Sequence, residues 1–211
     1  MKNKTRQPFV WMGGIAAIVA MAIAGLTVTQ AAAAGNVFHF DLVRSPALST
    51  SPNCVANATG SASIVQTGPV EILNVTVKGL PPKTDFDFFV IQVPNKPFGM
   101  SWYQGDIETN RKGVGHGKFI GRFSIETFVV APGVADAPLT FNNDFPSVSP
   151  NPETGPIQMY HLGLWFNLPA DAQNAGCPNT VTPFNGEHDA GVQVLNTSNF
   201  SDLQGPLVNV Q

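Results

Sequence analysis

The sequence predicts an all-β protein, an antiparallel Ig-like or Greek-key β-sandwich of about seven to eight strands with one short helix, preceded by a signal segment. Apolar and polar residues alternate with a period of two wherever the chain is regular, which is the pattern of half-buried strands. The 20 Gly and 18 Pro residues divide these runs into short pieces, as a sandwich requires. Hydrophobic residues make up 43% of the chain and charged residues 12%, which favours a packed core over disorder or a coiled coil.

Strands are expected where this alternation persists. The segments 37–42 and 71–77 alternate cleanly and predict half-buried strands. The segment 86–93 is apolar on both faces, so we predict a central strand there. The remaining strands are expected at 104–109 and 117–130, joined as a hairpin by a glycine-punctuated turn, at 157–168, at 190–195, and as one short strand at 139–141 within a long loop over 132–156.

One short helix is predicted over residues 169–175. Pro169 stands at an early helical position, where its missing N–H costs nothing. Gly176 follows as the residue that ends the helix.

The first 34 residues have the pattern of an export signal. Lys2, Lys4 and Arg6 precede an apolar run over 9–28, and the small residues up to Ala34 fit a signal-peptidase site. We therefore expect a signal peptide at 1–34 and a single β-sandwich domain at 35–211, secreted or at the cell surface, and the composition favours a bacterial source. The alternative is that the leader stays uncleaved as a membrane anchor, since its apolar run is nearly long enough to span a bilayer.

Charge argues against nucleic acid as a partner. Without the leader, the chain contains 8 Lys and Arg residues and 14 Asp and Glu residues, which gives a formal charge of −6. Such a surface repels phosphates and anionic lipid, and the basic residues are scattered along the chain. Contact with a membrane is therefore expected only through an uncleaved leader.

The chain has two cysteines, Cys54 and Cys177. An even count in an exported chain predicts a disulfide. The alternative is two unrelated buried thiols.

Two short segments resemble a known kind of protein. The run from Val75 to Phe86 (VTVKGLPPKTDF), followed by the run from Gly105 to Asn110 (GDIETN) and a glycine turn, is similar to exported bacterial β-sandwich proteins, including domains of the CHRD type. The resemblance covers about a third of the chain. It implies a β-sandwich fold and an extracytoplasmic location, and it assigns no catalytic residue.

A divalent-metal site is one alternative that the residue types allow. His161, Glu187, His188 and Asp189 carry nitrogen and oxygen ligands that suit such an ion, if the fold brings them together. Their spacing matches no ligand motif, and polar outward residues with a turn before the last strand explain them equally well. We therefore expect no cofactor, with a divalent metal as the alternative.

Aromatic residues gather in the segment 94–103, which is otherwise rich in turn residues. Phe98, Trp102 and Tyr103 could stack on a sugar ring or anchor a protein partner, or the first two could fold back onto the core. Ser101 lacks the G-x-S-x-G context of a nucleophile elbow, and no catalytic residue is predicted.

Together these observations favour an exported, disulfide-stapled module that binds an extracellular glycan or protein without catalysis. The alternatives are a secreted metal-binding or hydrolytic enzyme that uses His161 and the segment 187–189, and a carbohydrate-binding module that uses Phe98, Trp102 and Tyr103.

Overall fold

The computed structural model describes residues 36–131, 155–183 and 186–211. All of these belong to the compact unit Ala34–Gln211. The leader and the short strand expected at 139–141 lie outside the described residues. Among the described residues, no helix combines the length and apolar character that a membrane span requires.

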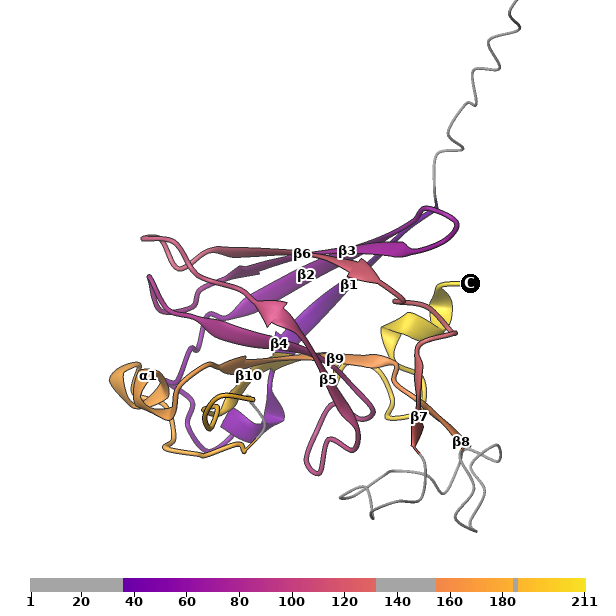
Figure 1. Ribbon diagram of the computed structural model, residues 1–211. Helices are drawn as coiled ribbons and strands as arrows, with labels where there is room; N and C mark the ends of the chain where they lie inside the picture. The colour runs from indigo at the N-terminus through magenta and orange to yellow at the C-terminus, as the bar shows by residue number, and fades with distance from the viewer. Residues whose placement is uncertain (1–35, 132–154, 184–185) are drawn as a thin grey trace, which may run out of the picture. The chain divides into compact units, whose positions relative to one another are not determined.

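The predicted fold class is confirmed: the described chain is antiparallel β-structure arranged in two layers (Figure 1). Eight strands form one continuous sheet in the order β5-β4-β9-β10-β1-β2-β3-β6, and two more strands form a separate ribbon, β7-β8. The strands are β1 (Val37–Arg44), β2 (Thr59–Gln66), β3 (Glu71–Lys78), β4 (Phe86–Ile91), β5 (Ser101–Asp106), β6 (Gly115–Gly121), β7 (Phe128–Ala131), β8 (Gly155–Gln158), β9 (His161–Phe166) and β10 (Gln193–Asn196).

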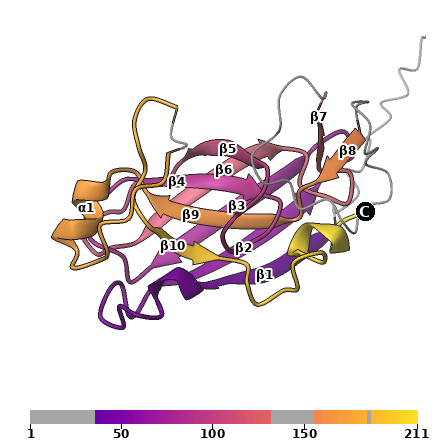
Figure 2. The same cartoon turned by 90° about the horizontal axis from the view of Figure 1, so that it is seen from below.

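Strand β1 holds the two layers together. Its first six residues pair with β2, in the layer that also contains β3 and β6. Its last two, Val43 and Arg44, pair with Asn196 and Leu195 of β10, in the layer that also contains β9, β4 and β5. Figure 2 shows β1 lying beside both β2 and β10. A long strand that takes part in both layers turns the sandwich into a barrel open along one side, between β5 and β6.

The main core fills the space between the layers. Strand β3 shows the alternation that the sequence predicts, with Leu73, Val75 and Val77 buried and the residues between them partly exposed. Phe86 and Phe88 of β4 face these residues from the other layer and are fully buried. Removing this apolar surface from water is the main contribution to stability.

The outer face of β4 and β9 carries a second apolar cluster, which explains why all six residues of each strand are buried. Trp165 lies at its centre, with its ring 5.4 Å from that of Phe89 and 5.1 Å from that of Phe98, both edge-on. Gly163 makes room for the indole, because a Cβ there would lie 2.4 Å from a Trp165 ring carbon. The prediction of 86–93 as a strand covered on both faces is confirmed, with β4 ending at Ile91.

The disulfide between Cys54 and Cys177 is formed and joins positions 123 residues apart. Cys54 lies in the loop between β1 and β2, which also contains the 3-10 helix η1 (Pro46–Leu48). Arg44 organises this loop by donating to the carbonyl oxygens of Leu48, Ser51 and Cys54. Cys177 follows α1 (Pro169–Asn174), the predicted helix, and Gly176 adopts the expected left-handed conformation with φ of 72°. Disulfides of this kind are typical of oxidising compartments outside the cytoplasm.

Several boundaries differ from those expected. Strand β2 was not expected, because its small residues (TGSASIVQ) weaken the hydrophobic signal. The segment 157–168 is divided between β8 and β9, which belong to different sheets, and the arm expected at 117–130 breaks at Arg122 before β7. The chain ends in a second 3-10 helix, η2 (Pro206–Asn209), whose Leu207 is buried.

Candidate binding site

The open side of the barrel lies between two strands that begin as a hairpin and then separate. Residues 107–114 connect β5 to β6, with a bridge between Thr109 and Gly115. From there β5 continues in one layer, paired with β4, and β6 continues in the other, paired with β3. Among the described residues, neither strand has a second strand neighbour.

A bulge in β5 sets the point where the two strands part. The register with β4 shifts between Phe88 and Phe89, so Gln104 is an extra residue in β5. Gly105 takes a φ of 142°, which favours glycine, and a Cβ there would lie 3.2 Å from the Phe119 ring of β6. The Phe119 ring in turn stacks on Phe88, with 5.1 Å between ring centroids. Aromatic packing therefore closes the barrel here and leaves it open further along.

Beyond this closure lies a cleft of about 630 Å³, here called the β5–β6 cleft. Three large apolar side chains surround it and remain exposed: Trp102 of β5 (60%), Ile120 of β6 (66%) and Phe128 of β7 (50%). Val90 and Met159 also line the cleft and are buried. The remaining lining residues are Gln104, Gly121, Arg122, Glu126, Thr127 and Val129.

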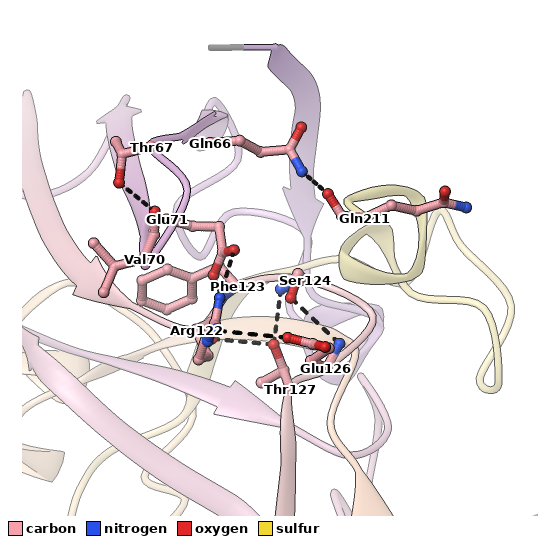
Figure 3. A network of polar contacts seen from close by, with 10 residues as sticks. All are labelled: Gln66, Thr67, Val70, Glu71, Arg122, Phe123, Ser124, Glu126, Thr127 and Gln211. Atoms are coloured by element: carbon pink, nitrogen blue, oxygen red, sulfur yellow. Dashed lines mark hydrogen bonds and ion pairs between the residues drawn. The ribbon is translucent and has the colours of Figure 1, made fainter. Parts of the chain in front are cut away.

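A buried carboxylate fixes the corner between β6 and β7, where one wall of the cleft turns (Figure 3). Glu71, the first residue of β3, accepts a hydrogen bond from the Phe123 backbone N–H at 2.9 Å and one from the Arg122 guanidinium at 3.3 Å. The buried Phe123 ring packs in the main core. Glu71 therefore satisfies a buried backbone donor and holds a cation at the rim of the cleft.

A tight turn continues from this corner to Phe128. Thr127 Oγ1 accepts from the Ser124 N–H at 2.8 Å and donates to the Arg122 carbonyl at 3.0 Å. The Arg122 guanidinium also pairs with Glu126, at 3.6 Å (Figure 3). The Thr127 carbonyl accepts from the Met159 N–H at 3.0 Å, which ties the turn to the segment between β8 and β9. These bonds place Phe128 and Glu126 at the cleft.

The three aromatic residues singled out in the sequence take three different positions. Phe98 is 6% exposed and packs edge-on against Trp165. Trp102 pairs with Val90 and lines the cleft. Tyr103, 49% exposed, points to the opposite face of β5, where its ring contacts Phe89. Only Trp102 of the three therefore belongs to the cleft.

Acidic residues surround Tyr103 on that opposite face. The Tyr103 hydroxyl donates to Asp106 at 2.6 Å. Burial, then this hydrogen bond, raises the pKa of Tyr103. Burial, then the nearby Asp106 charge, raises the pKa of Asp85. The phenol thus stays a hydrogen-bond donor at neutral pH.

His161 is fully buried at the start of β9 and ties down the C-terminal segment. Its Nδ1 lies 2.9 Å from Thr197 Oγ1, and its Nε2 lies 3.1 Å from both the Ser201 and the Asp202 carbonyl oxygens. Burial lowers the pKa of His161, because the charged imidazolium loses its hydration. Both ring nitrogens are therefore engaged within the fold.

The other residues considered as metal ligands lie elsewhere. Glu187, His188 and Asp189 are exposed, in the segment before Gly191, whose N–H donates to the Phe166 carbonyl at the far end of β9 from His161. Within the described part of the chain, no three His, Cys, Asp or Glu side chains form a group able to hold a metal ion. The structure thus leaves His161 apart from the segment 187–189.

Sequence reasoning found Trp102 but missed Ile120, Phe128 and Arg122. One signal was present, because Ile120 interrupts the alternation of β6: Lys118 and Ile120 share the outer face, where a polar residue is expected. The convergence of β5, β6 and β7 on one cleft has no local sequence signal.

The chain matches no known protein-family model, and no curated protein sequence matches it.

Proposed function

We propose that this protein is an exported, non-catalytic binding module that holds its ligand in the β5–β6 cleft. One observation carries the proposal: Trp102, Ile120 and Phe128, each half exposed or more, come from three different strands and meet at one cleft. Exposed apolar side chains are ordinary when scattered, whereas a contiguous group around a concavity marks a binding site. The disulfide supports export, because such bonds persist in oxidising compartments.

The charged groups at the cleft favour binding over acid–base chemistry. Arg122 pairs with both Glu71 and Glu126, so it serves to hold the corner. A non-catalytic binding role agrees with the resemblance to exported β-sandwich proteins of the CHRD type, and that resemblance stays a prediction. A carbohydrate-binding module is less well supported, since Phe98, Trp102 and Tyr103 do not form one platform.

Intrinsic fluorescence tests the proposal, because Trp102 is exposed while Trp165 is fully buried. The protein is isolated oxidised from an exporting host, and Trp11 is replaced by Phe if the leader is retained. Soluble β-glucan, soluble xylan and synthetic heptapeptides are then titrated. A ligand of the cleft should shift the Trp102 emission to the blue, protect it from acrylamide and raise the melting temperature.

Two neighbouring substitutions locate the site. Trp102→Ala should abolish binding, while Tyr103→Ala, on the opposite face of the same strand, should retain it. Because Trp102 is 60% exposed and Tyr103 is 49% exposed, neither change should unfold the protein. The proposal would be overturned if no panel member bound, or if the ligands bound equally well to Trp102→Ala.

A further inference from the structure

The walls of the β5–β6 cleft are two strand edges of one sheet. Strands β5 and β6 stand at the two ends of the eight-stranded order. An edge strand presents a row of backbone N–H and C=O groups along its outer side, ready to pair with another strand. In the part of the chain that the structure describes, these two rows border the same cleft. The cleft is therefore the position that a further strand of the sheet would take.

We propose that the ligand of this cleft is an extended segment of another polypeptide, which adds to the sheet as a strand. This rests on the proposed function and names its ligand class. Backbone hydrogen bonds to the free edges of β5 or β6 supply affinity, as in other cases of strand addition. The six residues of β5 and the seven of β6 limit the added segment to about six or seven residues, roughly 20 Å at 3.3 Å per residue.

The side chains around the cleft define the pattern of the added strand. Successive residues of a strand point to opposite faces, so every second residue of the ligand faces the cleft. The inward residues meet Trp102, which pairs with the buried Val90, and Phe128, so they should be apolar. The intervening residues share the outer face with Lys118 and Ile120, so a β-branched polar residue such as threonine suits them.

Charge at the open end of the cleft favours a basic residue in the bound segment. Arg122 is matched there by both Glu71 and Glu126, which leaves one net negative charge. A strand with Lys or Arg at the terminus that reaches this corner complements the charge.

A glycan fits this geometry less well. Sugar rings bind to flat platforms of exposed aromatic faces. The two exposed aromatic residues that line the cleft, Trp102 and Phe128, come from strands of different sheets, and Tyr103 points away from the cleft. Two facing strand edges match the regular donor and acceptor spacing of a polypeptide backbone.

The test uses the acetylated and amidated heptapeptide Lys-Val-Thr-Val-Thr-Val-Lys as the probe, with Trp102 emission and calorimetry as readouts. Its control carries N-methyl groups on the three valine nitrogens, which removes the hydrogen-bond donors along one edge and keeps every side chain. The unmodified peptide should bind, and the methylated one should bind at least about tenfold more weakly, because three hydrogen bonds are lost. A second control, methylated on the two threonine nitrogens and the last lysine nitrogen, shows whether the other edge also pairs.

Protein variants locate the binding. Trp102→Ala and Ile120→Ala should each weaken the unmodified peptide by about tenfold or more. Val181→Ala, at an apolar residue that is 50% exposed and does not line the cleft, should bind the peptide as the parent does. Melting curves of all the variants serve as the control, and they should show that substitutions at these exposed positions leave the protein folded.

The outcomes separate this inference from the proposed function. If all three peptides bound equally well and Trp102→Ala still abolished their binding, strand addition would be overturned, while the proposal that the cleft binds a ligand would stand. Binding of β-glucan or xylan without any peptide would do the same. If sedimentation showed that the protein self-associates and that Trp102→Ala prevents it, a second copy of this chain would occupy the cleft. The proposal of a different polypeptide as the ligand would then be overturned. If none of the peptides or polysaccharides bound, both proposals would be overturned.

Discussion

Replacing Cys54 and Cys177 together by Ala should lower the free energy of unfolding by about 5 kcal/mol. The bridge closes a loop of 123 positions, and in the chain-entropy model such a loop restricts the unfolded chain by about 5 kcal/mol at 25 °C. The native loop keeps other attachments, because Arg44 donates to three of its carbonyl oxygens. The loss should therefore arise mainly in the unfolded state.

Urea unfolding with linear extrapolation measures this difference. The melting temperature should fall by about 10 to 20 °C, given about 2 to 4 °C per kcal/mol for a domain of this size. Reduction of the parent protein by dithiothreitol should produce a similar loss. A double-alanine variant within about 1 kcal/mol of the oxidised parent would refute the chain-entropy reasoning here.

Three further predictions concern stability. Glu71→Gln should lower the free energy of unfolding in urea by about 2 to 3 kcal/mol, because it weakens a buried charge-assisted hydrogen bond to a backbone N–H. Arg122→Ala removes a half-exposed side chain and should lower it by less than about 1 kcal/mol. Equal losses in the two variants would contradict the view that the bond from Glu71 to the backbone matters more than its ion pair with Arg122. Stability should be full above about pH 6.5 and fall as the pH drops below it, by up to about 1.4 kcal/mol per pH unit, because the unfolded state binds a proton before the buried His161 does. The variant His161→Gln should lack this slope, and a slope that survives would assign it to other groups. Gly163→Ala should cost about 1 to 3 kcal/mol and alter the near-ultraviolet circular dichroism of Trp165, whereas an unchanged spectrum would mean that the indole does not need the space.

Local patterning predicted most of the strands because it depends on burial of one face. Strand β3 and the first half of β1 alternate cleanly, and the chain buries the expected residues. Strand β4 was recognised as central because both of its faces are apolar, and the structure covers them with the main core and with the Trp165 cluster. The helix α1 followed from Pro169 and Gly176, whose backbone preferences are intrinsic.

The features that sequence reasoning missed depend on contacts between distant segments. Strand β2 is rich in small residues, and its place is set by pairing with β1 and β3 on either side. The break at Arg122 depends on Glu71, which is 51 residues away and buried. The cleft itself requires β5, β6 and β7 to converge, so Trp102 was noticed as an aromatic residue in a turn-rich segment while its partners Ile120 and Phe128 were not.

The pairing of β1 with β10 has a consequence for how this chain is made. A polypeptide leaves the ribosome with its N-terminal end first, and Arg44 must wait for Leu195 before its side of the sheet can pair. Cys54 likewise waits as a free thiol until Cys177 arrives. Topologies with such distant pairings fold slowly. The eight-stranded sheet therefore becomes continuous only after residues 195 and 196 have been synthesised, which is long after β1 itself.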